Sequence, residues 1–220
     1  MKIFYGIPTH DRRVDVDCML SIMRSVQQFG GQTYFHMGIS EPHLARNLVT
    51  HKFLKSDCDW FQLIDSDIIF SAQDWDYLWE GDETIVTAPY ARKIPGKSPA
   101  MFGLGFTRVH RSAFHAMDEL TKEDGSPFVE QFYMDGEMMS HYYPGGVTGD
   151  SRWLGEDRGF FTLCAMAKIP YRMETRCQLQ HVGSFLYGYP HQDNGCEFWG
   201  PDPNPIDVEE PTDDGPVVIM

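Results

Sequence analysis

The sequence predicts a single α/β domain with a central mixed, mainly parallel sheet flanked by helices. Short apolar runs of strand length alternate with segments whose apolar residues recur every three or four positions, the pattern of strands and covering helices. The chain has 220 residues, 42% of them hydrophobic, which suits one domain with a sizeable core. No internal repeat or long flexible linker divides it.

The alternation begins at the N-terminus. Residues 2–7 form an apolar run that stops at Pro8, and residues 33–37 form a second run, so both are predicted strands. Between them, residues 16–28 have helical periodicity and are followed by two glycines, a typical helix stop. The predicted buried face of this helix consists of Val16, Met19, Leu20, Met23 and Val26.

A second helix is predicted after Ser40, the expected N-cap, with Pro42 in its first turn. Arg46 is placed at the margin of its apolar face. The residues expected to be buried are Leu44, Ala45, Leu48, Val49 and Phe53. The third predicted strand, residues 60–64, runs directly into the acidic sequence Asp65-Ser66-Asp67.

The later elements are less regular. The expected elements are a helix at 75–79 capped by Ser71 and Asp74, a strand at 84–88, a glycine-interrupted strand at 102–106, helices at 111–120 and 155–168, and strands at 171–174 and 178–182. Residues 135–152 contain Pro144 and four glycines, and they predict a mobile loop long enough to be functional.

The net charge of −14 is concentrated at the C-terminus. Residues 190–220 contain eight acids and no Lys or Arg, so the sequence predicts a domain at 1–189 and an acidic, Pro-rich tail at 190–220. No basic patch of the kind that binds nucleic acid stands out.

Five widely spaced cysteines without a Cys-x-x-Cys pair argue against a zinc site or disulfide framework. Cys18 and Cys164 are expected to be small buried hydrophobes. No run approaches the roughly 20 apolar residues of a membrane span, and the first apolar run is too short for a signal peptide. A cytoplasmic location is therefore expected, the host cytoplasm if the protein is viral.

Asp65-Ser66-Asp67 is the sharpest chemical feature. Side chains two apart in a strand share a face, so both carboxylates can converge on one hard cation at the strand's end. Carboxylate oxygens suit Mg²⁺ or Mn²⁺, ions that also hold a ligand's phosphates. The alternative is that Asp65 and Asp67 only form a turn.

Two further features carry possible chemistry. Glu156 and Asp157 open an apolar helix, where the helix dipole alone favours acids, but one of them can also serve as a general base. His181 stands alone on a predicted strand; it is either a packed residue or a neutral imidazole that completes a metal site with two carboxylates.

In order along residues 1–188, several short motifs together resemble GT-A glycosyltransferases, in particular small enzymes encoded by bacteriophages and large algal viruses. The motifs are Gly6-Ile7-Pro8-Thr9-His10-Asp11, Ala45-Arg46-Asn47, Asp65-Ser66-Asp67, Gly103-Leu104-Gly105-Phe106, Arg111-Ser112-Ala113-Phe114, Gly155-Glu156-Asp157-Arg158-Gly159-Phe160 and His181-Val182-Gly183. The resemblance implies a single Rossmann-like domain of the GT-A type.

The resemblance also implies roles for residues. A nucleotide-sugar donor, a UDP-sugar foremost, would contact Pro8, Thr9, Asp11, Arg46, Asp65, Ser66, Gly103 and Gly105. Asp65, Asp67 and His181 would surround Mn²⁺ or Mg²⁺. Asp157 would be the general base that drives inversion, and Glu156 would contact the acceptor or sugar.

The expected function is metal-dependent transfer of a sugar to the hydroxyl of a glycan or another acceptor. Transfer to hydroxymethylated bases of phage DNA is an alternative that the lack of a basic patch disfavours. A non-catalytic nucleotide-sugar or glycan-binding module is a second. A two-metal phosphohydrolase is a third, disfavoured because the other histidines do not cluster in the sequence.

Overall fold

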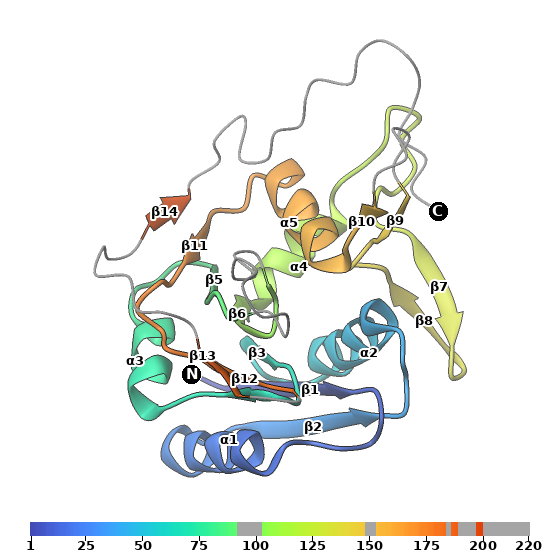
Figure 1. The fold of residues 1–220 in the computed structure, drawn as a ribbon. Helices are drawn as coiled ribbons and strands as arrows, with labels where there is room; N and C mark the ends of the chain where they lie inside the picture. Colours follow the sequence, from blue (N-terminus) through green and yellow to red (C-terminus); the bar gives the residue numbers. More distant parts are fainter. Residues whose placement is uncertain (92–102, 148–152, 184–185, 189–196, 200–220) are drawn as a thin grey trace.

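The predicted fold class is confirmed. The computed structural model describes residues 1–91, 103–147, 153–183, 186–188 and 197–199 (Figure 1). Within them, a seven-stranded sheet has the order β14 (Glu197–Trp199), β11 (Tyr171–Met173), β5 (Ile85–Thr87), β6 (Phe106–His110), β3 (Trp60–Ile64), β1 (Ile3–Thr9) and β2 (Gln32–Met37). Only β6 and β14 run antiparallel to their neighbours, so the sheet is mixed and mainly parallel.

Helices cover both faces of this sheet (Figure 1). The helices are α1 (Val16–Phe29), α2 (Pro42–Lys55), α3 (Ala72–Trp79), α4 (Arg111–Asp118) and α5 (Glu156–Met166). Side chains of α2, α4 and α5 pack in one core with Phe4 and Phe61, whereas α1 and α3 pack in a second core with Tyr5 and Ile64. Because successive strand residues face opposite sides, neighbours such as Phe4 and Tyr5 belong to different cores.

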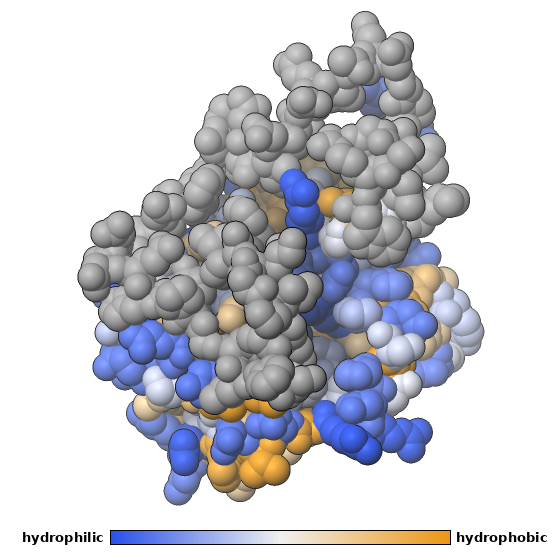
Figure 2. Space-filling model, viewed as in Figure 1, coloured by the Kyte–Doolittle hydropathy of each residue, from blue (hydrophilic) through white to orange (hydrophobic). Residues whose placement is uncertain are grey.

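Helix α1 forms where predicted, but its predicted buried face is wrong. Val16, Leu20 and Met23 are 72%, 41% and 58% exposed, and apolar surface appears at the bottom of Figure 2, where Figure 1 places α1. The buried residues are Cys18, Ser21, Ile22 and Ser25. Both serine hydroxyls donate to carbonyls one turn earlier, so burying them leaves no polar group unsatisfied and turns the helix away from its apolar stripe.

Two details of α2 also differ from expectation. Glu41, not Ser40, is the N-cap residue, and the Ser40 hydroxyl donates to the Glu41 carboxylate instead of capping the helix. Arg46 is only 4% exposed rather than marginal, because carboxylates from distant segments surround it. Leu44 is only partly buried, while Ala45, Leu48, Val49 and Phe53 are buried as predicted.

Several predicted boundaries hold closely. β3 spans the predicted 60–64, and α4 and α5 lie within their predicted helices. Ser71 and Asp74 form the predicted capping box of α3. Strand β1, in contrast, runs past its predicted end at residue 7 and includes Pro8. Pro8 is tolerated there because the pairing of β1 with β3 already ends at Gly6 and Leu63.

The glycine-interrupted strand at 102–106 is wrong in position: β6 begins only at Phe106, and residue 102 lies outside the described residues.

Part of the predicted loop 135–152 is also wrong. A hairpin of β7 (Gln131–Met134) and β8 (Glu137–Ser140) turns at Asp135 and Gly136, both with positive φ. Asp-Gly between two strand-like runs is the usual signature of such a turn.

The rest of that predicted loop contains a short pair, β9 (Gly146–Val147) with β10 (Trp153–Leu154), and residues 148–152 lie outside the described part. Of the predicted tail, the described residues are those of β14, which pairs with β11 at one edge of the sheet. The boundary at 189/190 stays a prediction. No helix in the described chain has the length and apolarity needed to cross a membrane.

Candidate functional site

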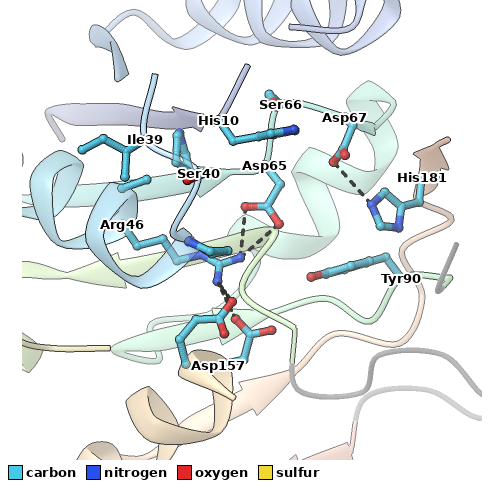
Figure 3. Close-up of a pocket in the computed structure, with 14 residues that line it drawn as sticks. His10, Ile39, Ser40, Arg46, Asp65, Ser66, Asp67, Tyr90, Asp157 and His181 are labelled. Carbon is cyan, nitrogen blue, oxygen red and sulfur yellow. Dashed lines mark hydrogen bonds and ion pairs between the residues drawn. The ribbon is translucent and has the colours of Figure 1, made fainter. Parts of the chain in front are cut away.

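A pocket of about 450 Å³ opens where the carboxyl ends of β1 and β3 meet the first turns of α2 and α5 (Figure 3). Ligands of open α/β sheets commonly bind at such strand ends. The pocket brings together most of the site residues predicted from the sequence: Pro8, Arg46, Asp65, Ser66, Asp67, Glu156, Asp157 and His181. These residues come from five separate stretches of the chain.

Asp67 and His181 meet on one side of the pocket. A small sheet of β4 (Ile68–Ile69), β12 (Gln180–Val182) and β13 (Leu186–Gly188) brings them together by pairing His181 with Ile68. The backbone N–H of Val182 donates to the carbonyl of Asp67 at 2.8 Å. The Nε2 atom of His181 lies 3.3 Å from Oδ1 of Asp67 (Figure 3).

The orientation of His181 fits a metal ligand. Its Nδ1 lies 2.7 Å from the carbonyl oxygen of Ala91, which can only accept, so Nδ1 carries a proton and Nε2 is the ring nitrogen that faces Asp67. Adjacent ligands at about 2.1 Å from an octahedral ion are separated by about 3 Å. The 3.3 Å gap between Nε2 and Oδ1 is therefore close to what a shared cation requires.

The predicted three-ligand metal site is not assembled. In the described parts of the chain, no group of three or more His, Cys, Asp or Glu side chains is placed to hold a metal ion. Both carboxylate oxygens of Asp65 lie 3.1 Å from Nη2 of Arg46, and this ion pair engages the carboxylate. The sequence pattern could not show this because the arginine comes from another element.

Arg46 is the centre of the other side of the pocket. Its Nη2 atom binds Asp65, and its Nη1 atom lies 2.6 Å from Oε1 of Glu156 and 3.0 Å from Oδ1 of Asp157 (Figure 3). Burial opposes the charge of Arg46, but the three carboxylates outweigh it and raise the pKa of the guanidinium. One buried cation thus serves three anions from two segments.

Asp157 has the electrostatics of a general base. Burial raises the pKa of its carboxyl to about 6; Arg46 opposes this shift, and the negative charges of Glu156 and Asp65 reinforce it. Its side chain remains 27% exposed at the pocket. A carboxyl with a pKa near 6 is ionised at neutral pH yet is a stronger base than an ordinary aspartate.

Tyr90 connects the two sides and was not predicted. Its ring stands edge-on to His181, with centroids 5.2 Å apart, and burial followed by the charges of Asp65 and Asp157 raises the pKa of its hydroxyl. Gly103 and Gly105 lie beneath this ring, where an added Cβ would approach ring carbons to 2.4 Å and 3.0 Å. The sequence offered one signal for Tyr90: it lies just after the predicted strand 84–88, and ligands of such sheets bind at strand ends.

Not every predicted residue reaches the pocket. Thr9 is buried and its hydroxyl donates to the carbonyl of His36, while Asp11 is exposed and accepts from the backbone of Arg13. Gly103 and Gly105 support Tyr90 and do not line the pocket. Lining residues that sequence reasoning missed as site residues are His10, Ile39, Ser40, Pro42 and Ala45, which follow β1 and β2.

Comparisons with known proteins support the fold alone. No protein-family profile matches the chain, and no curated protein matches it significantly. Among solved structures, the crystal structure of A197 from STIV is similar, with a TM-score of 0.54 and 14% identity, covering 87% of this chain and 96% of that one. At this identity the similarity establishes a shared architecture and leaves the activity open.

Proposed function

We propose that this protein is a glycosyltransferase of the GT-A kind, which transfers a sugar from a nucleotide-sugar donor to an acceptor hydroxyl. The observation that carries the proposal is the composition of one pocket. Asp67 and His181 face each other on one side, and the partly buried Asp157, whose pKa is raised, stands on the other. Sugar transfer from a diphosphate to a hydroxyl is assisted by both groups: a bound cation stabilises the leaving diphosphate, and a base activates the hydroxyl.

Asp67 and His181 would hold Mn²⁺ or Mg²⁺, with the donor's phosphates completing the coordination. Divalent ions of this kind are commonly held by one or two protein ligands together with substrate phosphates, so two ligands suffice. When bound, the ion would offset the negative charge that develops on the leaving nucleoside diphosphate. Without such an ion, the pocket's four carboxylates would repel a diphosphate.

Asp157 would take the proton from the acceptor hydroxyl as its oxygen bonds to the anomeric carbon. The bond from that carbon to the diphosphate oxygen breaks, and attack from the opposite side inverts the configuration. Glu156, 2.6 Å from Arg46 and 27% exposed, would contact the acceptor or sugar. Modified DNA is disfavoured as acceptor because a chain of net charge −14 repels a polyanion.

A thermal-shift experiment tests donor binding. UDP, other nucleoside diphosphates and their sugar conjugates are added with and without Mn²⁺. A ligand that binds the folded state at about 100 times its Kd stabilises it by about 2.7 kcal/mol, so the matching nucleotide should raise Tm in the presence of the ion. Asp67→Ala and His181→Ala should lose that increase, whereas Asp57→Ala, an exposed acid paired with Lys2, should retain it.

Turnover separates an enzyme from a binding module. Asp157→Asn should keep the metal-dependent Tm increase but slow sugar transfer by about 10²–10⁴-fold, the usual contribution of a general base. If no nucleotide raises Tm with or without the ion, the donor assignment is wrong. If the wild type binds a nucleotide sugar yet neither transfers nor hydrolyses it, the protein is a binding module.

A further inference from the structure

Arg46 lies between the two ends of the pocket and contacts both. Asp65, at the end of β3, approaches Nη2 with two oxygens at 3.1 Å. Glu156 and Asp157, in the first turn of α5, approach Nη1 at 2.6 Å and 3.0 Å. The two groups of carboxylates therefore share a single guanidinium, each through a different terminal nitrogen.

This sharing matters because Arg46 itself is only 4% exposed. Water therefore screens the guanidinium from its partners less than at a surface, although the three carboxylates are 21–27% exposed at the pocket. The groups that face Asp157 from the surrounding elements are Arg46, Asp65, Tyr90, Tyr143 and its neighbour Glu156. Both tyrosines have raised pKa values and are neutral, which leaves one positive charge against three negative ones.

We propose that Arg46 is a positioning residue that couples the two ends of the pocket, so that a ligand engaging Asp65 changes how firmly the Asp157 carboxylate is held. This inference rests on the proposed function for its meaning, since it links the donor end to the base. The sequence resemblance places Arg46 beside the nucleotide; the geometry gives it three protein partners instead.

The direction of the coupling follows from the charges. A donor group that hydrogen-bonds to Asp65 or neutralises it removes a negative charge near Asp157 and leaves more of the guanidinium for Asp157. Both changes favour the ionised carboxylate. The pKa of Asp157 would then be lower when the Asp65 end is occupied than when it is empty.

Direct titration of Asp157 tests this without any ligand or activity. The side-chain carboxyl of the full-length, metal-free protein is followed by ¹³C NMR across pH in the wild type and in Asp65→Asn. Removing the Asp65 charge should lower the midpoint of Asp157 by about 1 pH unit, the scale of neighbouring-charge effects. Asp67→Asn is the matched control: it removes an equal charge two residues away that pairs with His181, and it should leave the midpoint in place.

Glu156→Gln provides a second variant: it removes the other carboxylate that shares the guanidinium and that directly raises the pKa of Asp157, so it should also lower the midpoint, even if Asp65→Asn does not fold. An unchanged midpoint in the folded variants, or an equal shift in Asp67→Asn, would overturn the coupling. UDP with Mg²⁺ is then added to the wild type. If UDP with Mg²⁺ lowers the midpoint of Asp157, the result supports both the coupling through Arg46 and the donor assignment. If UDP does not bind while Asp65→Asn lowers the midpoint, the coupling stands and the donor assignment fails.

Discussion

Arg111 closes the C-terminal end of α2, the helix that carries Arg46 into the pocket. Its guanidinium donates five hydrogen bonds of 2.7–3.0 Å to four backbone carbonyls. The carbonyls belong to Phe53, Leu54, Ser56 and Cys58. The same group lies 4.6 Å from the centroid of the Phe53 ring. Replacing Arg111 with Met would keep the apolar stem and remove all of these contacts.

The expected loss can be worked out from those contacts. A hydrogen bond to a charged group contributes about 1.5–3 kcal/mol, and a cation over an aromatic ring adds about 0.5–1 kcal/mol. Because Arg111 is only partly buried, water can reach some of the freed carbonyls and offset much of the sum. We therefore expect Arg111→Met to lower the free energy of unfolding by about 3 kcal/mol.

Urea unfolding at neutral pH measures this value, and a chain of this size should also lose about 6–12 °C in Tm. Arg111→Lys should recover only part of the stability, because an ammonium cannot reproduce the planar set of donors. Lys2→Met is the surface control; it removes an exposed ion pair with Asp57 and should change nothing measurable. A loss below about 1 kcal/mol for Arg111→Met would refute the view that this arginine terminates α2.

Two further predictions concern charge and packing. Hydrogen bonds from Lys55 and His51 lower the pKa of Glu137 from its ordinary value of 4.5 to about 2. The ionised carboxylate therefore stabilises the fold fully above pH 4.5, and this stabilisation is lost as the pH falls from 4.5 to about 2. The stability difference between wild type and Glu137→Gln, measured by urea unfolding, should therefore shrink across that window; a constant difference would contradict the assigned contacts. At the start of α5, a Cβ on Gly159 would lie 1.7 Å from the carbonyl oxygen of Pro144, whereas one on Gly155 meets nothing within 4 Å. Urea unfolding should show Gly159→Ala losing about 3 kcal/mol and Gly155→Ala under about 1 kcal/mol, and equal losses would rule out the close packing of α5 on Pro144.

The sequence predicted those parts of the fold that depend on local signals. Strand β3 is an apolar run interrupted only by Gln62, and α3 has a complete capping box, so both were placed closely. The buried face of α1 was predicted wrongly. Periodicity assigns Val16 to the apolar face and Ser21 to the polar one, but the Ser21 hydroxyl donates to a carbonyl within the helix, so Ser21 can be buried. The hairpin at Asp135-Gly136 was missed although its turn signal was present.

The candidate site was predicted in part for the same reason. Motifs at strand and helix ends identified Asp67, Asp157 and His181, and all three line one pocket. Their partners could not be predicted, because Asp65 and Glu156 reach Arg46 from 19 and 110 residues away. Helical periodicity alone predicts that Arg46 lies at the margin of the buried face. Its actual burial depends on tertiary contacts, which the periodicity does not contain.

Three of the places where pattern reasoning failed lie close together. Arg46 is a charge on a buried helix face, the strand expected from residue 102 is replaced by glycines beneath Tyr90, and β1 carries Pro8 beyond its pairing with β3. Arg46 and Pro8 line one pocket, and the glycines lie beneath Tyr90, which lines it too. Local rules are expected to be broken where function requires it, whereas the α1 and hairpin misses have simple local causes. Since the departures were found without reference to ligand chemistry, their convergence is independent support for this pocket as the functional site.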